Sequence, residues 1–241
     1  IDAFCELGAQ SAAEVRPTYE CSPIVDSTEV VAKIAEADRA IAPMAKLPLG
    51  FAETAIKRDR DNESPLLNFL TAAFRRASGA DIAMVNTGGI RTDIDAGEFR
   101  YENLYQISPF NNRAVILSPM TVPTLLKIFE RSARSCGKYG AVLGSGVRVV
   151  YRRGDCKSSV DGMDPNASVV TMELLDGTML YDARDPANVK ISPRTIRMAT
   201  LDFLEAGGSG YSAFREAPRE ADLGIFRELI VKELTKNPGM I

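Results

Sequence analysis

Apolar residues recur at helical spacing in four stretches of the chain. They predict amphipathic helices over residues 26–42, 65–78, 121–135 and 220–236. In the second stretch, Ser64 and Pro65 are typical of an N-cap and a first helical residue, and Gly79 is placed to end the helix. In the first stretch, Asp26 precedes a glutamate by three residues, which is a capping signal, and Pro43 is expected to stop the helix.

Shorter apolar or alternating runs predict β-strands between these helices. The predicted strands are 81–86, 113–118, 146–153, 168–175, 178–181 and 194–200. Asp176-Gly177 joins two of them and is a strong signal for a hairpin. Because helices alternate with strands and hairpins, we predict a single α/β domain with mixed sheets, preceded by the first helix as a linker. The sequence alone does not say which strands pair.

Composition and charge narrow the possible functions. The chain has 241 residues, and its 29 basic and 32 acidic side chains give a net charge of −3, so no general attraction to nucleic acid or to an anionic membrane is expected. No apolar run approaches the ~18 residues that a membrane span needs. The sequence contains no histidine. This excludes Ser-His-Asp and Cys-His catalysis, zinc sites built on histidine and imidazole-liganded two-metal sites.

Four cysteines occur, at positions 5, 21, 136 and 156. None forms the C-x-x-C spacing of zinc or redox motifs, so we predict no metal site. Three disulfide connectivities are possible, and we favour the pairs Cys5–Cys21 and Cys136–Cys156 because they close the shortest loops. The even count favours an oxidising compartment, with four free buried thiols as the alternative.

The sequence contains two short motifs that occur at dinucleotide and metal sites in other proteins. Gly208–Ala213 matches G-x-G-x-x-A, but it lies near the C-terminus outside any repeated βαβ unit, so a dinucleotide site is disfavoured. Asp93 and Asp95 have the D-x-D spacing of a metal site, which would make the chain a self-sufficient enzyme. We expect these aspartates instead to cap or solvate a loop.

The segment 86–91 (NTGGIR) carries the most specific chemistry. Gly88 and Gly89 let backbone N–H groups approach an anion, Arg91 supplies a forked donor, and the amide of Asn86 can read a base or ribose edge. We interpret it as an anion-binding loop, with a plain tight turn as the alternative. Two aromatics in other loops, Phe110 and Phe203, are placed to clamp a flat ring, although a lone phenylalanine is more often a core residue.

Taken together, four strings resemble the C-terminal substrate-binding domain of the 5'-nucleotidase family, which includes bacterial UDP-sugar hydrolases and ecto-5'-nucleotidases. The strings are NTGGIRTDI, YENLYQISPFNN, GSGVRVVY and LDFLEAGGSGY, in this order. An earlier string from Arg60, RDNESPLLNFL, is similar to the motif that opens this domain. The resemblance covers about residues 26–215.

The resemblance implies roles for individual residues. Phe110 and Phe203 match the aromatics between which family members stack the nucleobase. Three residues match positions that contact the base, ribose or phosphate, and two match more variable lining positions. The first set is Arg60, Asn86 and Arg91, and the second is Asn112 and Gly146.

One departure bears on the ligand. Where the family has G-G-D-G and its Asp binds ribose hydroxyls, this chain has Ser209. A serine loses the ionised acceptor, whose hydrogen bonds contribute about 1.5 to 3 kcal/mol. Ribose selectivity is therefore in question, and the ligand is a nucleotide or a related phosphorylated compound.

The resemblance also implies an organisation. Family members hydrolyse phosphate esters at a pair of divalent metal ions in an N-terminal metallophosphoesterase domain, which a chain without histidine cannot contain. We expect residues 1–25 to be the tail of that missing domain, 26–45 a linker helix and 46–241 the substrate-binding domain. This chain would then bind substrate without a catalytic residue or cofactor of its own, in a periplasmic or secreted parent enzyme of nucleotide catabolism. The alternative is a non-catalytic binding or scaffold domain that keeps the fold but not nucleotide recognition.

Overall fold

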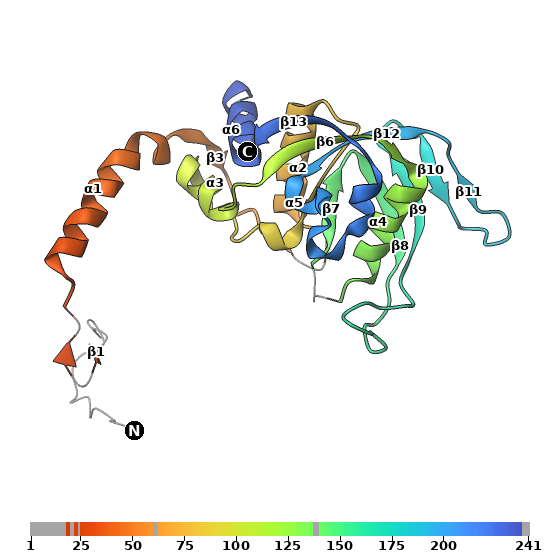
Figure 1. The fold of residues 1–241 in the computed structure, drawn as a ribbon, viewed down its shortest axis with the longest axis horizontal. Helices are drawn as coiled ribbons and strands as arrows, with labels where there is room; N and C mark the ends of the chain where they lie inside the picture. The colour runs from red at the N-terminus through yellow and green to blue at the C-terminus, as the bar shows by residue number, and fades with distance from the viewer. Residues whose placement is uncertain (1–17, 20–21, 24, 60–61, 137–139, 238–241) are drawn as a thin grey trace. The chain divides into compact units, whose positions relative to one another are not determined.

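The computed structural model describes residues 18–19, 22–23, 25–59, 62–136 and 140–237, and the chain divides into two units, Ile1–Ala45 and Lys46–Ile241 (Figure 1). In the first unit, β1 (Thr18–Tyr19) pairs with β2 (Ser22–Pro23), and helix α1 spans Thr28–Ala45. Pro43 lies inside α1, so the expectation that it stops the helix is wrong. None of the helices in the described ranges is both long and apolar enough to cross a bilayer.

The second unit is built around a five-stranded mixed sheet in the order β13-β6-β12-β4-β7. Its strands are β4 (Ile82–Asn86), β6 (Arg113–Thr121), β7 (Val142–Ser145), β12 (Thr195–Leu201) and β13 (Arg219–Ile225). Strand β12 runs parallel to β4 and antiparallel to β6, while β7 is antiparallel to β4 and β13 to β6. The predicted α/β class with mixed sheets is thus confirmed.

Both faces of this sheet are buried, which explains why the first four residues of β4, Ile82 to Val85, are all apolar. Successive side chains of β4 alternate between two cores: Ala83 and Val85 face one, and Ile82 and Met84 the other. Helices α2 (Pro65–Ser78) and α6 (Phe226–Lys236) cover the first face, and α4 (Val122–Arg134) covers the second (Figure 1).

The remaining elements flank this central body. A four-stranded antiparallel sheet packs on the α4 side, and a two-stranded sheet lies near the start of the unit. The first comprises β8 (Val147–Arg152), β9 (Ser168–Leu174), β10 (Met179–Asp182) and β11 (Lys190–Ile191), and the second β3 (Pro48–Ala52) and β5 (Gly97–Arg100). The unit also contains short helical elements between its strands. These are α3 (Tyr101–Ile107), α5 (Asp202–Glu205), and the 3-10 turns η1 (Thr87–Gly89), η2 (Gly208–Gly210) and η3 (Ser212–Glu216).

The capping and turn signals correctly located several boundaries. The Ser64 hydroxyl accepts the backbone N–H of Leu67 at the start of α2, and Gly79 ends the helix in the left-handed conformation. Strands β9 and β10 pair as the Asp176-Gly177 hairpin, with Gly177 at φ 86°.

The predicted helix over 220–236 is wrong in its first third. Residues Arg219–Ile225 form strand β13, paired with β6 from Arg219↔Leu117 to Ile225↔Arg113, and the helix begins only at Phe226. Most of the apolar residues at helical spacing lie within α6 itself. The preceding segment, 219–225, instead contains Gly224 at φ 88°, a backbone conformation outside the α-helical region. Pairing with a buried neighbouring strand overrides weak local preference.

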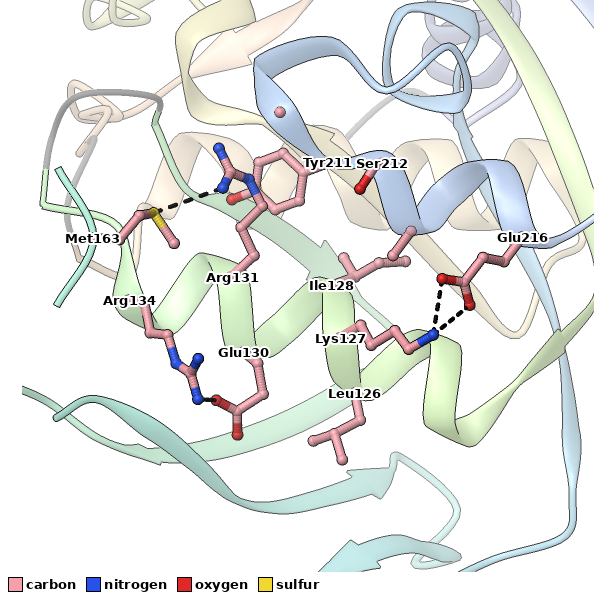
Figure 2. Close-up of a pocket in the computed structure, with 12 residues that line it drawn as sticks. Leu126, Lys127, Ile128, Glu130, Arg131, Arg134, Met163, Tyr211, Ser212 and Glu216 are labelled. Atoms are coloured by element: carbon pink, nitrogen blue, oxygen red, sulfur yellow. Dashed lines mark hydrogen bonds and ion pairs between the residues drawn. The ribbon is translucent and has the colours of Figure 1, made fainter. Parts of the chain in front are cut away.

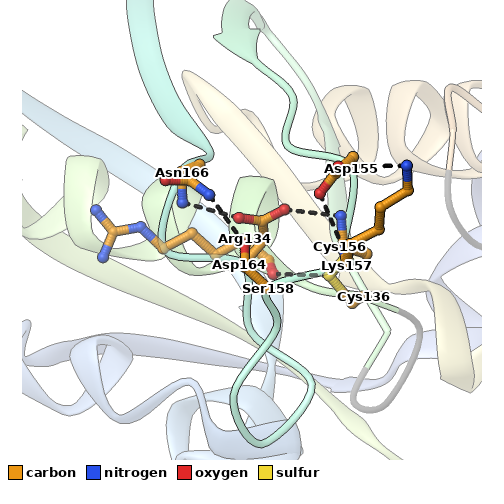
Figure 3. The surroundings of a disulfide bond; sticks show 8 residues. All are labelled: Arg134, Cys136, Asp155, Cys156, Lys157, Ser158, Asp164 and Asn166. Carbon is orange, nitrogen blue, oxygen red and sulfur yellow. Dashed lines mark hydrogen bonds and ion pairs between the residues drawn. A yellow bond between two sulfur atoms is a disulfide. The ribbon is translucent and has the colours of Figure 1, made fainter.

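The predicted Cys136–Cys156 disulfide is present, with an S–S distance of 2.11 Å (Figure 3). It joins the end of α4 to the β8–β9 connection. Nearby Asp164 is buried, and its two carboxylate oxygens accept the backbone N–H groups of Cys156 and Asn166. The carboxylate therefore shapes the loop around the disulfide. Cys5 and Cys21 lie outside the described residues.

Gly146, which joins β7 to β8, has φ 101°, and a Cβ there would lie 2.1 Å from the carbonyl oxygen of Asp81. We expect Gly146→Ala to lower the free energy of unfolding by clearly more than Gly224→Ala, measured by urea denaturation. Gly224 also has positive φ but has open space around it, so only backbone strain of about 1–2 kcal/mol applies there. Equal losses in the two variants would contradict the steric explanation.

Replacing Cys136 and Cys156 by serine together should lower the free energy of unfolding by about 3 kcal/mol, because the bridge closes a loop of about 20 residues in the unfolded chain. Thermal unfolding with and without a reductant measures this, and EDTA is the control. A loss of stability on EDTA treatment would instead point to a metal at these sulfurs.

Candidate functional site

Sheet topology brings three loops to one edge of the five-stranded sheet. Parallel strands β4 and β12 both end at this edge, and antiparallel β6 begins there, with Leu201 of β12 opposite Ala114 of β6. The segments after β4, before β6 and after β12 therefore meet, although they are distant in sequence. These are the three segments in which the sequence analysis found the NTGGIR string, Phe110 and Phe203.

A pocket of about 240 Å³ lies where these loops meet. Among the described residues, the lining consists of seven predicted site residues: Asn86, Gly88, Gly89, Phe110, Asn112, Phe203 and Ser209. Phe110 and Phe203 are 45% and 41% exposed. Neither aromatic is therefore a core residue, and both present ring surface to the same pocket.

The turn that follows β4, Thr87–Gly89, is called here the glycine loop, and Asn86 directly before it lines the pocket. Asn86 is only 5% exposed, yet its side-chain oxygen has no hydrogen-bond partner within the described part of the protein. A Cβ on Gly89 would come within 3.1 Å of this oxygen, so glycine is what allows the amide to lie over the loop. An unpartnered buried polar atom costs about 1–3 kcal/mol, which a bound ligand that donates a hydrogen bond would offset.

Phe203 is held by two contacts. Its ring lies against the Gly208 backbone, where an added Cβ would sit 2.5 Å from ring carbons. The Asp202 carboxylate accepts the backbone N–H groups of Phe203 at 2.8 Å and Arg113 at 3.0 Å. Because Arg113 directly follows Asn112, Asp202 ties the loop before β6 to the loop after β12.

Ser209 adopts a left-handed conformation, with φ 52° between two glycines. Its carbonyl accepts a 2.8 Å hydrogen bond from Arg131, which also stacks over the ring of Tyr211. Burial raises the pKa of Tyr211 to about 12, so its hydroxyl remains a donor, and it donates to the Gly140 carbonyl. The sequence analysis did not identify Arg131 or Tyr211 as supports of this loop.

Two predicted residues that the structure describes, Arg91 and Gly146, do not line this pocket. Arg91 is exposed beside the glycine loop, and its guanidinium donates to the Gly88 carbonyl at 3.2 Å without lining the pocket. Gly146 sits at the opposite end of β4, against Asp81, so its expected place in the lining is wrong. The glycine that does adjoin the loop is Gly140, where a Cβ would lie 2.9 Å from the Thr87 hydroxyl. Arg60 lies outside the described residues.

The D-x-D pair has a structural explanation. Asp93 accepts the backbone N–H of Arg58 at 2.9 Å and pairs with Lys57 at 3.0 Å. The hydrogen bond from the Arg58 backbone, which has the larger effect, and the contact with Lys57 both lower the pKa of Asp93 below its usual value. Asp95 is exposed. Asp93 therefore orders the neighbouring loop, while Asp95 is solvated.

A larger pocket, of about 490 Å³, lies between α4 and the segment that follows Ser209 (Figure 2). Four of its charged side chains form two ion pairs: Lys127 pairs with Glu216 at 2.8 Å, and Arg134 with Glu130 at 3.0 Å. The fifth, Arg131, donates to the Ser209 carbonyl. Size alone therefore does not identify the functional pocket. The smaller one has exposed aromatics and the unpartnered buried amide oxygen.

The chain is similar to known proteins over most of its length. The family model "5'-nucleotidase, C-terminal domain" matches residues 33–216. The "Trifunctional nucleotide phosphoesterase protein YfkN" of Bacillus subtilis is 27% identical over 203 residues, covering 78% of this chain and 13% of the relative. "Protein UshA" of Escherichia coli is 26% identical over 194 residues, covering 78% of this chain and 31% of the relative.

Solved structures agree on the fold. A 5'-nucleotidase precursor from Thermus thermophilus superposes with a TM-score of 0.63 at 20% identity, covering 86% of this chain and 40% of the other. The chain thus spans less than half the length of these proteins. Because the family model matches well over half of the chain, the protein described here belongs to the 5'-nucleotidase family and carries its C-terminal domain.

Proposed function

We propose that this chain is the substrate-binding domain of a 5'-nucleotidase-like phosphoester hydrolase, and that its 240 Å³ pocket holds the base and sugar of a nucleotide. The observation that carries the proposal is the meeting of Phe110 and Phe203 in one pocket with Asn86. Two half-exposed rings offer stacking surface to a flat base, and the unpartnered Asn86 oxygen can accept a hydrogen bond from its edge.

The phosphate would lie toward the Arg91 side. The guanidinium of Arg91 is exposed next to the Gly88 carbonyl, and the backbone of the glycine loop is open to close approach. In this arrangement the chain binds and orients the nucleotide. In the parent enzyme a divalent metal pair in an upstream metallophosphoesterase domain would activate water against phosphorus, which keeps affinity and chemistry on different domains.

The proposed domain organisation follows from the same assignment. Residues 1–25 would be the end of the upstream domain, Asp26–Ala45 the linker helix and Lys46–Ile241 the binding domain. The Cys136–Cys156 disulfide supports a periplasmic or secreted location, since disulfides persist in oxidising compartments. A role in nucleotide catabolism would follow from hydrolysis of the bound nucleotide.

A second candidate is a binding or scaffold domain that has lost nucleotide recognition, and Ser209 favours it. A thermal-shift panel of nucleoside monophosphates, cyclic nucleotides and nucleotide sugars separates the two functions. Stabilisation by at least one class supports the proposed function, and no shift with any compound at millimolar concentration supports the scaffold.

Phe110→Ala and Phe203→Ala should each weaken nucleoside monophosphate binding by about 5- to 150-fold, because stacking on one aromatic contributes about 1–3 kcal/mol. Arg91→Ala should weaken binding several-fold through lost contact with the phosphate. Isothermal titration calorimetry measures all three. Phe51→Ala is the matched control, since Phe51 is a 60% exposed phenylalanine on β3. Unchanged affinity in both pocket variants would remove the proposed site.

Ser209→Asp should increase affinity for ribonucleotides by about 5- to 13-fold, because a hydrogen bond to an ionised acceptor contributes about 1.5–3 kcal/mol, against about 0.5–1.5 kcal/mol for a neutral one. The gain should vanish for 2',3'-dideoxynucleotides, which lack the hydroxyls. Ser209→Asn controls for the backbone conformation, because asparagine tolerates positive φ without carrying charge. An equal gain with both nucleotides would contradict ribose recognition at this position.

A further inference from the structure

We propose that Arg227, in the first turn of α6, is a positioning residue that fixes the loop carrying Phe110 and Asn112 for ligand binding. The inference rests on the proposed function, because it concerns the same pocket. Arg227 lies 117 residues beyond Phe110 in sequence. It does not line the pocket, so it acts through the loop rather than on the ligand.

The guanidinium of Arg227 is buried and donates hydrogen bonds to several acceptors. Arg227 is 5% exposed. One terminal nitrogen donates to the carbonyls of Ser108 at 2.9 Å and Phe110 at 3.4 Å, and the other donates to the Asn111 side-chain oxygen at 3.0 Å. Its Nε donates to the Tyr101 hydroxyl at 3.2 Å. Three residues of the loop before β6, Ser108, Phe110 and Asn111, are thus bound to one planar group.

Further contacts fix the guanidinium itself. It stacks over the ring of Tyr105 at 4.5 Å, and Tyr101 donates to the Glu228 carboxylate at 2.8 Å. The positive charge is therefore linked through one hydroxyl to a carboxylate on its own helix. The plane of the guanidinium cannot rotate freely, so its donors point in fixed directions.

Next to Arg227, the backbone N–H of Phe226 donates to the Asn112 carbonyl at 2.9 Å. Two adjacent residues at the start of α6 therefore hold four positions of this loop: Arg227 holds 108, 110 and 111 through its side chain, and Phe226 holds 112 through its backbone. Since the Phe110 ring is nearly half exposed, burial of the ring fixes its position less than these bonds do.

An arginine suits this role better than a lysine. A guanidinium presents five donors in a rigid fork, whereas an ammonium on a flexible stem cannot reach the same acceptors together. Arg227→Lys keeps the charge and most of the volume but loses the fork. It is therefore the informative variant, with Asn111→Ala as a milder one that removes a single acceptor at the surface.

The test combines binding with a readout that needs no ligand. Titration calorimetry with adenosine and uridine monophosphates measures affinity, and hydrogen exchange of the free protein is followed in peptides covering 105–113. We expect Arg227→Lys to weaken binding by about tenfold and to speed exchange in 105–113 but not in 86–89. In a Phe110→Ala background, Arg227→Lys should weaken binding much less, because the side chain that it positions is gone.

The matched control is Glu233→Gln on the same helix, which breaks the 3.2 Å ion pair with Arg76 and touches no part of the loop. It should change thermal stability without changing exchange in 105–113. If Arg227→Lys does not fold, Asn111→Ala should show the same effects at smaller size.

Each outcome decides a separate question. Equal loss of affinity with and without Phe110, or unchanged exchange in 105–113, would overturn the positioning role. If the wild-type chain binds neither these nucleotides nor any compound of the thermal-shift panel, the proposed function fails, and the exchange experiment alone then decides whether Arg227 holds the loop.

Discussion

The pairing of β4, β12 and β6 within one sheet is the constraint on which the rest of the structure depends. Because β12 runs parallel to β4 and antiparallel to β6, two strand ends and one strand start share an edge. Each delivers one wall of the pocket. A different order of these strands would scatter the same loops, so the site is a property of the topology before it is a property of any side chain. Burial of the sheet on both faces holds this order in place.

Residues that line the pocket and residues that hold it come from different parts of the sequence. The lining residues lie on the three loops, where side chains are exposed enough to meet a ligand. Their supports are polar groups aimed at backbone atoms: Asp202 accepts two N–H groups, Arg131 donates to a carbonyl and Arg227 to two. Such contacts do not depend on the side chain at the supported position. Lining residues can therefore change while the loops keep their shape.

This division explains what the sequence could predict. Strings such as NTGGIR and the LDFL stretch are local, so their chemistry can be read without knowing the fold, whereas Asn112 and Ser209 were predicted from the family resemblance. Local signals also located α2 through Ser64 and Gly79. Long-range pairing has no local signal. The pairing of β13 with β6, the place of Gly146 at the opposite end of β4 and the contacts of Arg227 all depend on residues far apart in sequence, so the local pattern did not predict them.

At Ser209, the contacts that hold the backbone conformation do not involve the side chain that faces the pocket. A serine gains nothing from the left-handed conformation that it adopts here, whereas asparagine and aspartate tolerate it better. The conformation must therefore be imposed from outside, by the flanking Gly208 and Gly210 and by the hydrogen bond from Arg131 to the Ser209 carbonyl. Since that bond reaches the backbone, the side chain is free to vary without loss of the turn. The loop can thus keep its shape whichever side chain position 209 presents to the pocket.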